Sequence, residues 1–289
     1  MPVKPILVPV SAAEASRPAL ETAACIAQKF GAHIEALHVR TDPRGLVPYT
    51  GEGMDGSMIE EIMDVTEREG RERQAKAHEM FREFCAAKGI KESTRPTDTP
   101  EPTIAWRDEV GREDEVVAVR GRIFDLIVVG RPLRDQPLPS PVTLEAALLD
   151  SGRPIIVAPP GNLVDCGASI AIAWEGTREA ARAIADALPL LKKAGNVTVM
   201  AGRALSEENP KPEDYVEKLA WHSIKSHIHR FDAGLADLGI AYLREASKLG
   251  ADLLVKGAYS QSRVRQLIFG GRTSHILSHA EIPVLFSHC

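Results

Sequence analysis

Small and polar residues near the C-terminus have the types and the spacing that suit a phosphate-binding turn. Gly257 ends an apolar run that begins at Leu253, and Ser260 follows after two residues. Nine residues, 261–269, separate Ser260 from Gly270 and Gly271. Glycine lets a backbone approach a ligand closely, and the start of a helix presents unpaired N–H groups with a partial positive charge. The chemistry that this pattern favours is therefore the binding of a phosphate group.

The residues that follow would complete such a turn. Arg272 and Thr273 are expected to begin a helix, and both side chains can donate hydrogen bonds to phosphate oxygens. A short helix is expected over 262–269, so the two small-residue turns would form two walls of a nucleotide cleft. Spacing alone also fits two tight turns without a ligand, and this alternative stays open.

The elements that must position these turns alternate between strand and helix. The predicted strands are short and almost wholly apolar, which is typical of parallel strands covered on both faces. Ligands bind such sheets at the carboxyl ends of the strands, where the strand order reverses. In the second half, strands are predicted at about 169–174, 197–201, 227–231, 252–256 and 282–287, and helices at about 177–194, 212–223, 235–249 and 271–280.

The chain repeats itself. "PILVPVSAAEAS" near the start resembles "SIAIAWEGTREA" from Ser169, and "DLIVVGRP" at Asp125 matches "DLLVKGAY" at Asp252. Each copy has a strand, a small polar turn and a helix. We therefore expect two α/β domains in tandem, 1–160 and 166–289, each a doubly wound, open parallel sheet of five strands.

The first copy carries an insertion. The offset between matching residues is 164 at Ile6 and Ile170, but 127 at Asp125 and Asp252. About 37 extra residues therefore lie between the second strand of the first copy and the strand at Asp125. Apolar residues at helical spacing predict one long helix over 57–87. Its charged residues fit a solvated face, and a helix that docks a partner is the alternative.

The arrangement resembles the universal stress protein family, whose nucleotide-binding members carry G-x2-G-x9-G-[ST] after the fourth strand. Here Ser260 replaces the second glycine and Gly271 replaces the final hydroxyl residue. The resemblance covers nearly the whole chain outside the insertion. It implies a Rossmann-like tandem protein of the stress response that binds ATP or AMP, with or without magnesium, in its C-terminal domain.

The same resemblance places the nucleoside against the turn after the first strand of the second half. Glu175 stands where the family has aspartate, Gly176 follows it, and Met200 would face the base. Trp174 would either stack on a ring or fill the core. The cofactor-binding residues implied by the motif and this turn are Trp174, Glu175, Gly176, Met200, Gly257, Ser260, Gly270, Gly271, Arg272 and Thr273.

The first half departs further from the family pattern. A loop rich in proline, which lacks the N–H donor, follows Gly130, and Ser11 replaces the acidic turn residue. The resemblance therefore implies a domain that keeps the fold and has lost the nucleotide. The closing strands "RPIIVAP" and "IPVLFSH" are expected at sheet edges, where they would pair the two domains as a pseudo-dimer. Association of two chains as a homodimer is also expected.

Bulk properties narrow the function classes. The formal net charge of −5 argues against a broad nucleic-acid surface, and no window has the roughly 18 apolar residues of a membrane helix. A cytoplasmic location is expected.

His227 and His229 could share a strand face, but we expect a half-exposed strand and no metal site there. No G-x-S-x-G, G-x-x-x-x-G-K-[ST] or H-E-x-x-H motif is present, so no catalytic residue is assigned. A binding or signalling module is favoured, with two alternatives: a nucleotide-independent scaffold or binder of another small ligand, and a slow ATPase.

Overall fold

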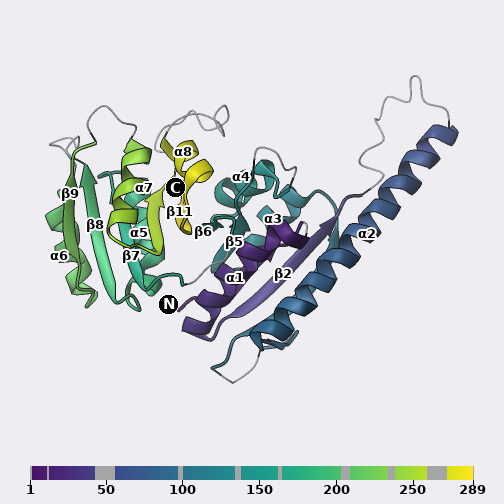
Figure 1. Cartoon of the computed structure of the whole chain (residues 1–289), viewed down its shortest axis with the longest axis horizontal. Helices are drawn as coiled ribbons and strands as arrows, with labels where there is room; N and C mark the ends of the chain where they lie inside the picture. The colour runs from purple at the N-terminus through teal and green to yellow at the C-terminus, as the bar shows by residue number, and fades with distance from the viewer. Residues whose placement is uncertain are drawn as a thin grey trace.

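The computed structural model describes residues 2–11, 13–42, 56–96, 100–133, 138–161, 165–202, 209–233, 238–258 and 272–288. Strands and helices alternate along both halves (Figure 1). The first half contains β1 (Pro5–Pro9), α1 (Ala13–Phe30), β2 (His33–Arg40), α2 (Gly56–Lys88), β3 (Lys91–Glu92), β4 (Thr103–Val110), α3 (Glu113–Gly121), β5 (Leu126–Gly130), α4 (Pro141–Asp150) and β6 (Ile155–Ala158). The second half contains β7 (Ser169–Trp174), α5 (Arg178–Leu191), β8 (Asn196–Gly202), α6 (Pro212–Trp221), β9 (His227–Phe231), α7 (Leu238–Lys248), β10 (Leu253–Gly257), α8 (Arg272–His279) and β11 (Val284–Ser287).

Among the described residues, eleven strands form one continuous sheet in the order β3-β4-β2-β1-β5-β6-β11-β10-β7-β8-β9. Each half is parallel within itself, and the two halves meet where β6 runs antiparallel to β11. At this seam Ile156 pairs with Leu285 and Ile155 with Phe286. The prediction of two parallel α/β halves in tandem is confirmed. The first half also has a two-residue edge strand, β3, that the sequence did not predict.

Helices cover both faces of the sheet, and both cores run across the seam. One face buries apolar residues of α1, α2, α5 and α6, and the other buries those of α3, α4, α7 and α8. Because each inner strand is buried on both faces, its sequence is nearly all apolar, as expected for parallel sheets. One contact across the seam adds to this packing, since Arg131 donates from Nη1 to the carbonyl of Ala280. Lys29 Nζ also lies 3.2 Å from Asp165 Oδ1 in the segment that connects the halves.

The long inserted helix is confirmed as α2, from Gly56 to Lys88. Its C-terminal part packs into the first domain, where Ala77, Phe81 and Phe84 are buried. Its N-terminal part extends beyond the sheet (Figure 1), and there Ile59 and Met63 are only half-buried. A docking role for this part of the helix stays a prediction.

The histidine strand is half-exposed, as expected. His227 is exposed on β9, and His229 Nε2 lies 2.9 Å from Glu245 Oε2 of α7. Within the described residues, no group of three or more His, Cys, Asp or Glu side chains is arranged to hold a metal ion. None of the described helices is long and apolar enough to cross a membrane.

The seam makes a specific prediction about stability. Leu285 is 1% exposed in the middle of β11, so Leu285→Ala should lower the free energy of unfolding by about 2–5 kcal/mol. Because the two halves share a sheet and two cores, they should unfold together. The fluorescence of Trp106 in the first half and of Trp174 in the second half should therefore show the loss of stability in the same urea transition. Val119→Ala, at a residue 59% exposed on α3, should change stability by less than about 0.5 kcal/mol. A loss confined to one half would show that the seam does not couple them.

Candidate functional site

The strand order of the second half reverses between β7 and β10. The chain runs from β7 through β8 to β9 on one side, and β10 and β11 lie on the other side. Glu175 follows β7 directly and Gly257 ends β10, so the two residues lie on either side of the reversal. This is the position at which doubly wound sheets bind their ligands.

A buried ion pair occupies this position. Lys256 Nζ, one residue before the end of β10, lies 2.8 Å from Glu175 Oε2, and the two side chains are 3% and 12% exposed. The other carboxylate oxygen of Glu175, Oε1, is buried and has no hydrogen-bond partner among the described residues. A buried acceptor without a partner is costly. The geometry therefore leaves one carboxylate oxygen for which the described part of the chain supplies no donor.

Glu175 is among the residues predicted from the sequence, whereas Lys256 is not. The signal was present, because Lys256 interrupts the run "LLVKG" in a strand predicted to be covered on both faces. A lysine is almost never fully buried unless it is paired. The matching residue of the first half is Val129, so the pair belongs to the second half alone.

Gly257 has a packing role that spacing did not reveal. A Cβ at this position would lie 2.4 Å from the backbone nitrogen of Ala180 and 2.8 Å from the carbonyl oxygen of Glu179. The first turn of α5 therefore rests directly on the end of β10. Thr177 caps that turn, because its Oγ1 accepts from Ala180 N at 3.2 Å. The absence of a side chain at Gly257 thus fixes where α5 begins.

Gly176 forms the turn between β7 and α5. Its φ is +69°, a left-handed conformation that favours glycine, and a Cβ there would lie 2.6 Å from Cβ of Asn209. Gly176 therefore holds the backbone next to Glu175 in a turn that other residues would strain.

Trp174 and Met200 are core residues. The Trp174 ring is buried 4.3 Å from the Tyr215 ring, measured between centroids, and its Nε1 donates to Pro210 O at 3.1 Å. Of the two roles considered for Trp174, filling the core is the one that the structure shows. Met200 lies two residues before the end of β8 and is fully buried on the opposite face of the sheet. The structure therefore brings Glu175, Gly176 and Gly257 together and leaves Trp174 and Met200 inside the core.

Most of the remaining motif residues lie in a part of the chain that the structure does not describe. Ser260, Gly270 and Gly271, and the short helix expected over 262–269, lie outside the described residues. Arg272 and Thr273 are the first residues of α8, as expected for a helix that follows the glycines. Their binding role stays a prediction.

The equivalent position of the first half, at the ends of β1 and β5, is filled by protein. Ser11 Oγ donates to Glu113 Oε1 at 2.7 Å, and burial raises the pKa of the Glu113 carboxyl. Next to it, Pro139 packs against Gly130, where a Cβ would meet the proline ring at 2.8 Å. The space left between these residues is about 10 Å³, which is close to the least that one water needs.

The contact at Gly257 predicts that alanine substitutions at two glycines change the free energy of unfolding in opposite directions. Gly257→Ala should lower the free energy of unfolding by at least about 2 kcal/mol, because the new methyl group meets backbone that cannot move independently. Gly70→Ala, in α2 with nothing within 4 Å, should raise it by about 1 kcal/mol. Chemical denaturation measures both. Equal effects at the two positions would contradict the close packing of α5 on β10.

The ion pair predicts non-additive substitutions. Lys256→Met should cost about 3 kcal/mol of stability, because it leaves the Glu175 carboxylate buried without its cation. Adding Glu175→Gln should recover most of that loss, since the charge is then gone as well. A complete double-mutant cycle measured by chemical denaturation checks this. If the double variant is no more stable than Lys256→Met, the two side chains do not act as a pair.

Comparison with known proteins agrees with the tandem α/β fold. Residues 2–137 and 169–288 each match the model of the universal stress protein family. A search of curated proteins found no match. Among solved structures, the chain is similar to a universal stress protein from Archaeoglobus fulgidus DSM 4304, with 18% identity, a TM-score of 0.68 and coverage of 98% of this chain and 96% of that one. It is also similar to a functionally unknown protein from Pseudomonas aeruginosa PAO1, with 16% identity, a TM-score of 0.53 and coverage of 99% and 92%. With two matched regions in succession, the chain belongs to the universal stress protein family as a tandem, two-domain member.

Proposed function

We propose that this stress-response protein binds an adenine nucleotide, ATP or AMP, in the crevice of its C-terminal half and acts as a binding or signalling module. The observation that carries the proposal is the buried Lys256–Glu175 pair at the strand reversal, with one carboxylate oxygen that has no hydrogen-bond partner among the described residues. Hydroxyl groups such as those of a ribose are donors of the kind that this oxygen lacks.

The phosphate end of the ligand would lie toward the start of α8. This helix begins at Arg272, directly after the two glycines of the motif, and its first N–H groups have no partner within the helix. Gly270 and Gly271 would present backbone donors, and Arg272 and Thr273 would hold phosphate oxygens. Gly257 would contribute by fixing α5 against β10, and Ser260 would border the ribose.

The two halves differ in a way that supports a single site. In the first half, the Ser11–Glu113 hydrogen bond and the Pro139 ring fill the corresponding crevice. In the second half, the corresponding end of the sheet carries the Lys256–Glu175 ion pair, and Oε1 of Glu175 has no hydrogen-bond partner among the described residues. One nucleotide per chain is therefore proposed.

Isothermal titration calorimetry with ATP, ADP and AMP, with and without magnesium, tests this function. We expect one nucleotide per chain. Gly270→Asp should weaken binding at least about tenfold, because a carboxylate at the start of the helix repels phosphate. Gly70→Asp introduces the same group on α2 and should leave the affinity unchanged.

Two results would replace the proposal with its alternatives. Titrations without heat at any nucleotide, together with a different small molecule or none in native mass spectra of gently purified protein, would favour a scaffold or a binder of another ligand. Release of inorganic phosphate from bound ATP, abolished by Gly270→Asp, would instead identify a slow ATPase at the same site.

A further inference from the structure

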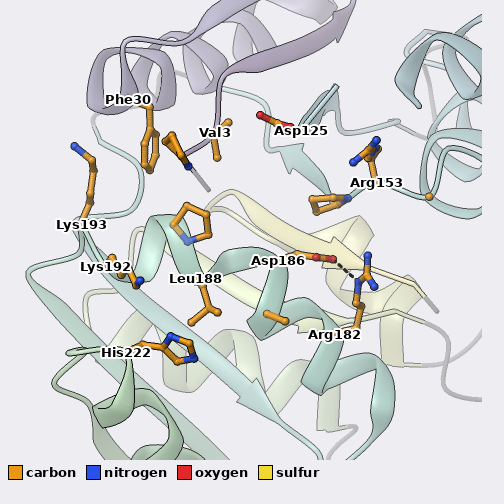
Figure 2. Close-up of a pocket in the computed structure, with 15 residues that line it drawn as sticks. Val3, Phe30, Asp125, Arg153, Arg182, Asp186, Leu188, Lys192, Lys193 and His222 are labelled. Carbon is orange, nitrogen blue, oxygen red and sulfur yellow. Dashed lines mark hydrogen bonds and ion pairs between the residues drawn. The ribbon is translucent and has the colours of Figure 1, made fainter. Parts of the chain in front are cut away.

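A cavity lies between the two halves, away from the strand reversal of the C-terminal domain (Figure 2). Its volume is about 670 Å³, within the range of small-molecule sites. The first half contributes Val3 before β1, Phe30 at the end of α1 and the residues that precede β5 and β6. The second half contributes one side of α5 and the residues after it. None of the residues proposed for the nucleotide lines this cavity.

The charge of the lining is opposite to that of the chain. Four cationic and two acidic side chains give the lining a formal charge of +2, whereas the whole chain carries −5. Figure 2 shows two cations on each side of the space with apolar side chains between them. The charged residues are Arg153, Arg182, Lys192, Lys193, Asp125 and Asp186.

Both acidic residues are already engaged. Asp125 accepts the backbone N–H of Lys4 at 2.9 Å, and its counterpart Asp252 accepts backbone N–H groups before β7 in the same way. This contact therefore belongs to the repeated fold. Asp186 accepts from Arg182 Nε at 3.0 Å within α5. Since both carboxylates are satisfied by the protein, the lining has no acidic group set aside for a cation.

The remaining cations have no acidic partner among the described residues. Lys193 Nζ lies 5.2 Å from the centroid of the Phe30 ring, and no described side chain pairs with Lys192. Arg153 donates from Nε to the carbonyl of Arg122 at 3.1 Å and also from Nη2, which fixes the plane of its guanidinium group. Lys192 and Lys193 on one side of the cavity and Arg153 on the other thus have no ion pair with a described carboxylate, whereas Arg182 is paired with Asp186.

Apolar side chains form the wall between these cations. Val3 and Leu188 lie between the lysine pair and the arginines in Figure 2, and the Phe30 ring faces the same space. Pro154 and Pro189 add apolar surface. An inorganic anion would leave this wall uncovered, and an uncharged apolar molecule would leave the lysines without a partner.

We infer that this cavity binds a small organic anion with an apolar body, such as an aromatic or aliphatic carboxylate, sulfonate or phosphate. The apolar part lies against Val3, Phe30 and Leu188, and the acidic group is held by Lys192 and Lys193. Both domains contribute to the site, so binding also holds the two halves in their present arrangement. This inference does not depend on the nucleotide proposal.

Titration of the full-length protein with 8-anilinonaphthalene-1-sulfonate, followed by fluorescence, tests the inference. Saturable binding of one molecule per chain is expected, and saturating ATP should not displace it. The double substitution Lys192→Gln and Lys193→Gln should weaken binding about tenfold, which corresponds to two partly exposed charge contacts. N-phenyl-1-naphthylamine has the same rings without the sulfonate, and its affinity should change less than twofold between the two proteins.

Two matched variants act as controls. Lys192→Arg with Lys193→Arg keeps both charges and should retain the affinity. Lys76→Gln with Lys88→Gln removes the same charge from exposed positions on α2 and should also retain it. A thermal melt confirms that each variant is folded.

Three outcomes would overturn the inference. In the first, the glutamine variant binds the sulfonate as tightly as the wild type. In the second, it loses the neutral probe to the same degree as the sulfonate, which would indicate a change in the apolar wall alone. In the third, ATP displaces the sulfonate, which would place the probe in the C-terminal crevice and leave the nucleotide proposal intact.

Discussion

The antiparallel pairing of β6 with β11 is the interaction on which the rest of the molecule depends. Each half has a parallel sheet with one edge strand that is short and wholly buried, and such an edge exposes backbone donors and acceptors. Pairing the two edges satisfies those groups and joins eleven strands into one sheet. It also extends two hydrophobic cores across the seam, so the domains share their interior.

The strands of one half run antiparallel to those of the other, so the carboxyl ends of the two sets of parallel strands lie at opposite ends of the common sheet. The two crevices of the tandem repeat are therefore separate, and each could change without affecting the other. The first holds the Pro139 ring and the Ser11–Glu113 hydrogen bond, whereas the second holds a lysine beside its acidic residue. The seam also brings α5 beside the start of β1, which creates the cationic cavity between the halves.

Much of this architecture could be read from the sequence. Internal repetition predicted the tandem α/β halves, and helical spacing located α2 to within a residue at each end. The errors have physical causes. β8 runs from Asn196 to Gly202, one residue longer at each end than predicted, and the direction in which Met200 faces depends on the helices packed on the sheet, which strand spacing does not give. Lys256 interrupts an apolar run, but its partner Glu175 is 81 residues away, so the sequence does not show which residue it pairs with. Contacts between residues far apart in sequence also decide the role of Gly257 and the existence of the cavity between the halves, and no local pattern records them.

The most direct test of this account is a crystal structure of the full chain grown with saturating AMP or a non-hydrolysable ATP analogue. The account predicts one nucleotide per chain, bound at the strand reversal between β7 and β10, with a ribose hydroxyl on the free oxygen of Glu175. It also predicts that the Ser11–Glu113 hydrogen bond and the Pro139 contact persist without ligand. A nucleotide in the first-half crevice, or an unliganded second-half crevice at saturation, would contradict the account.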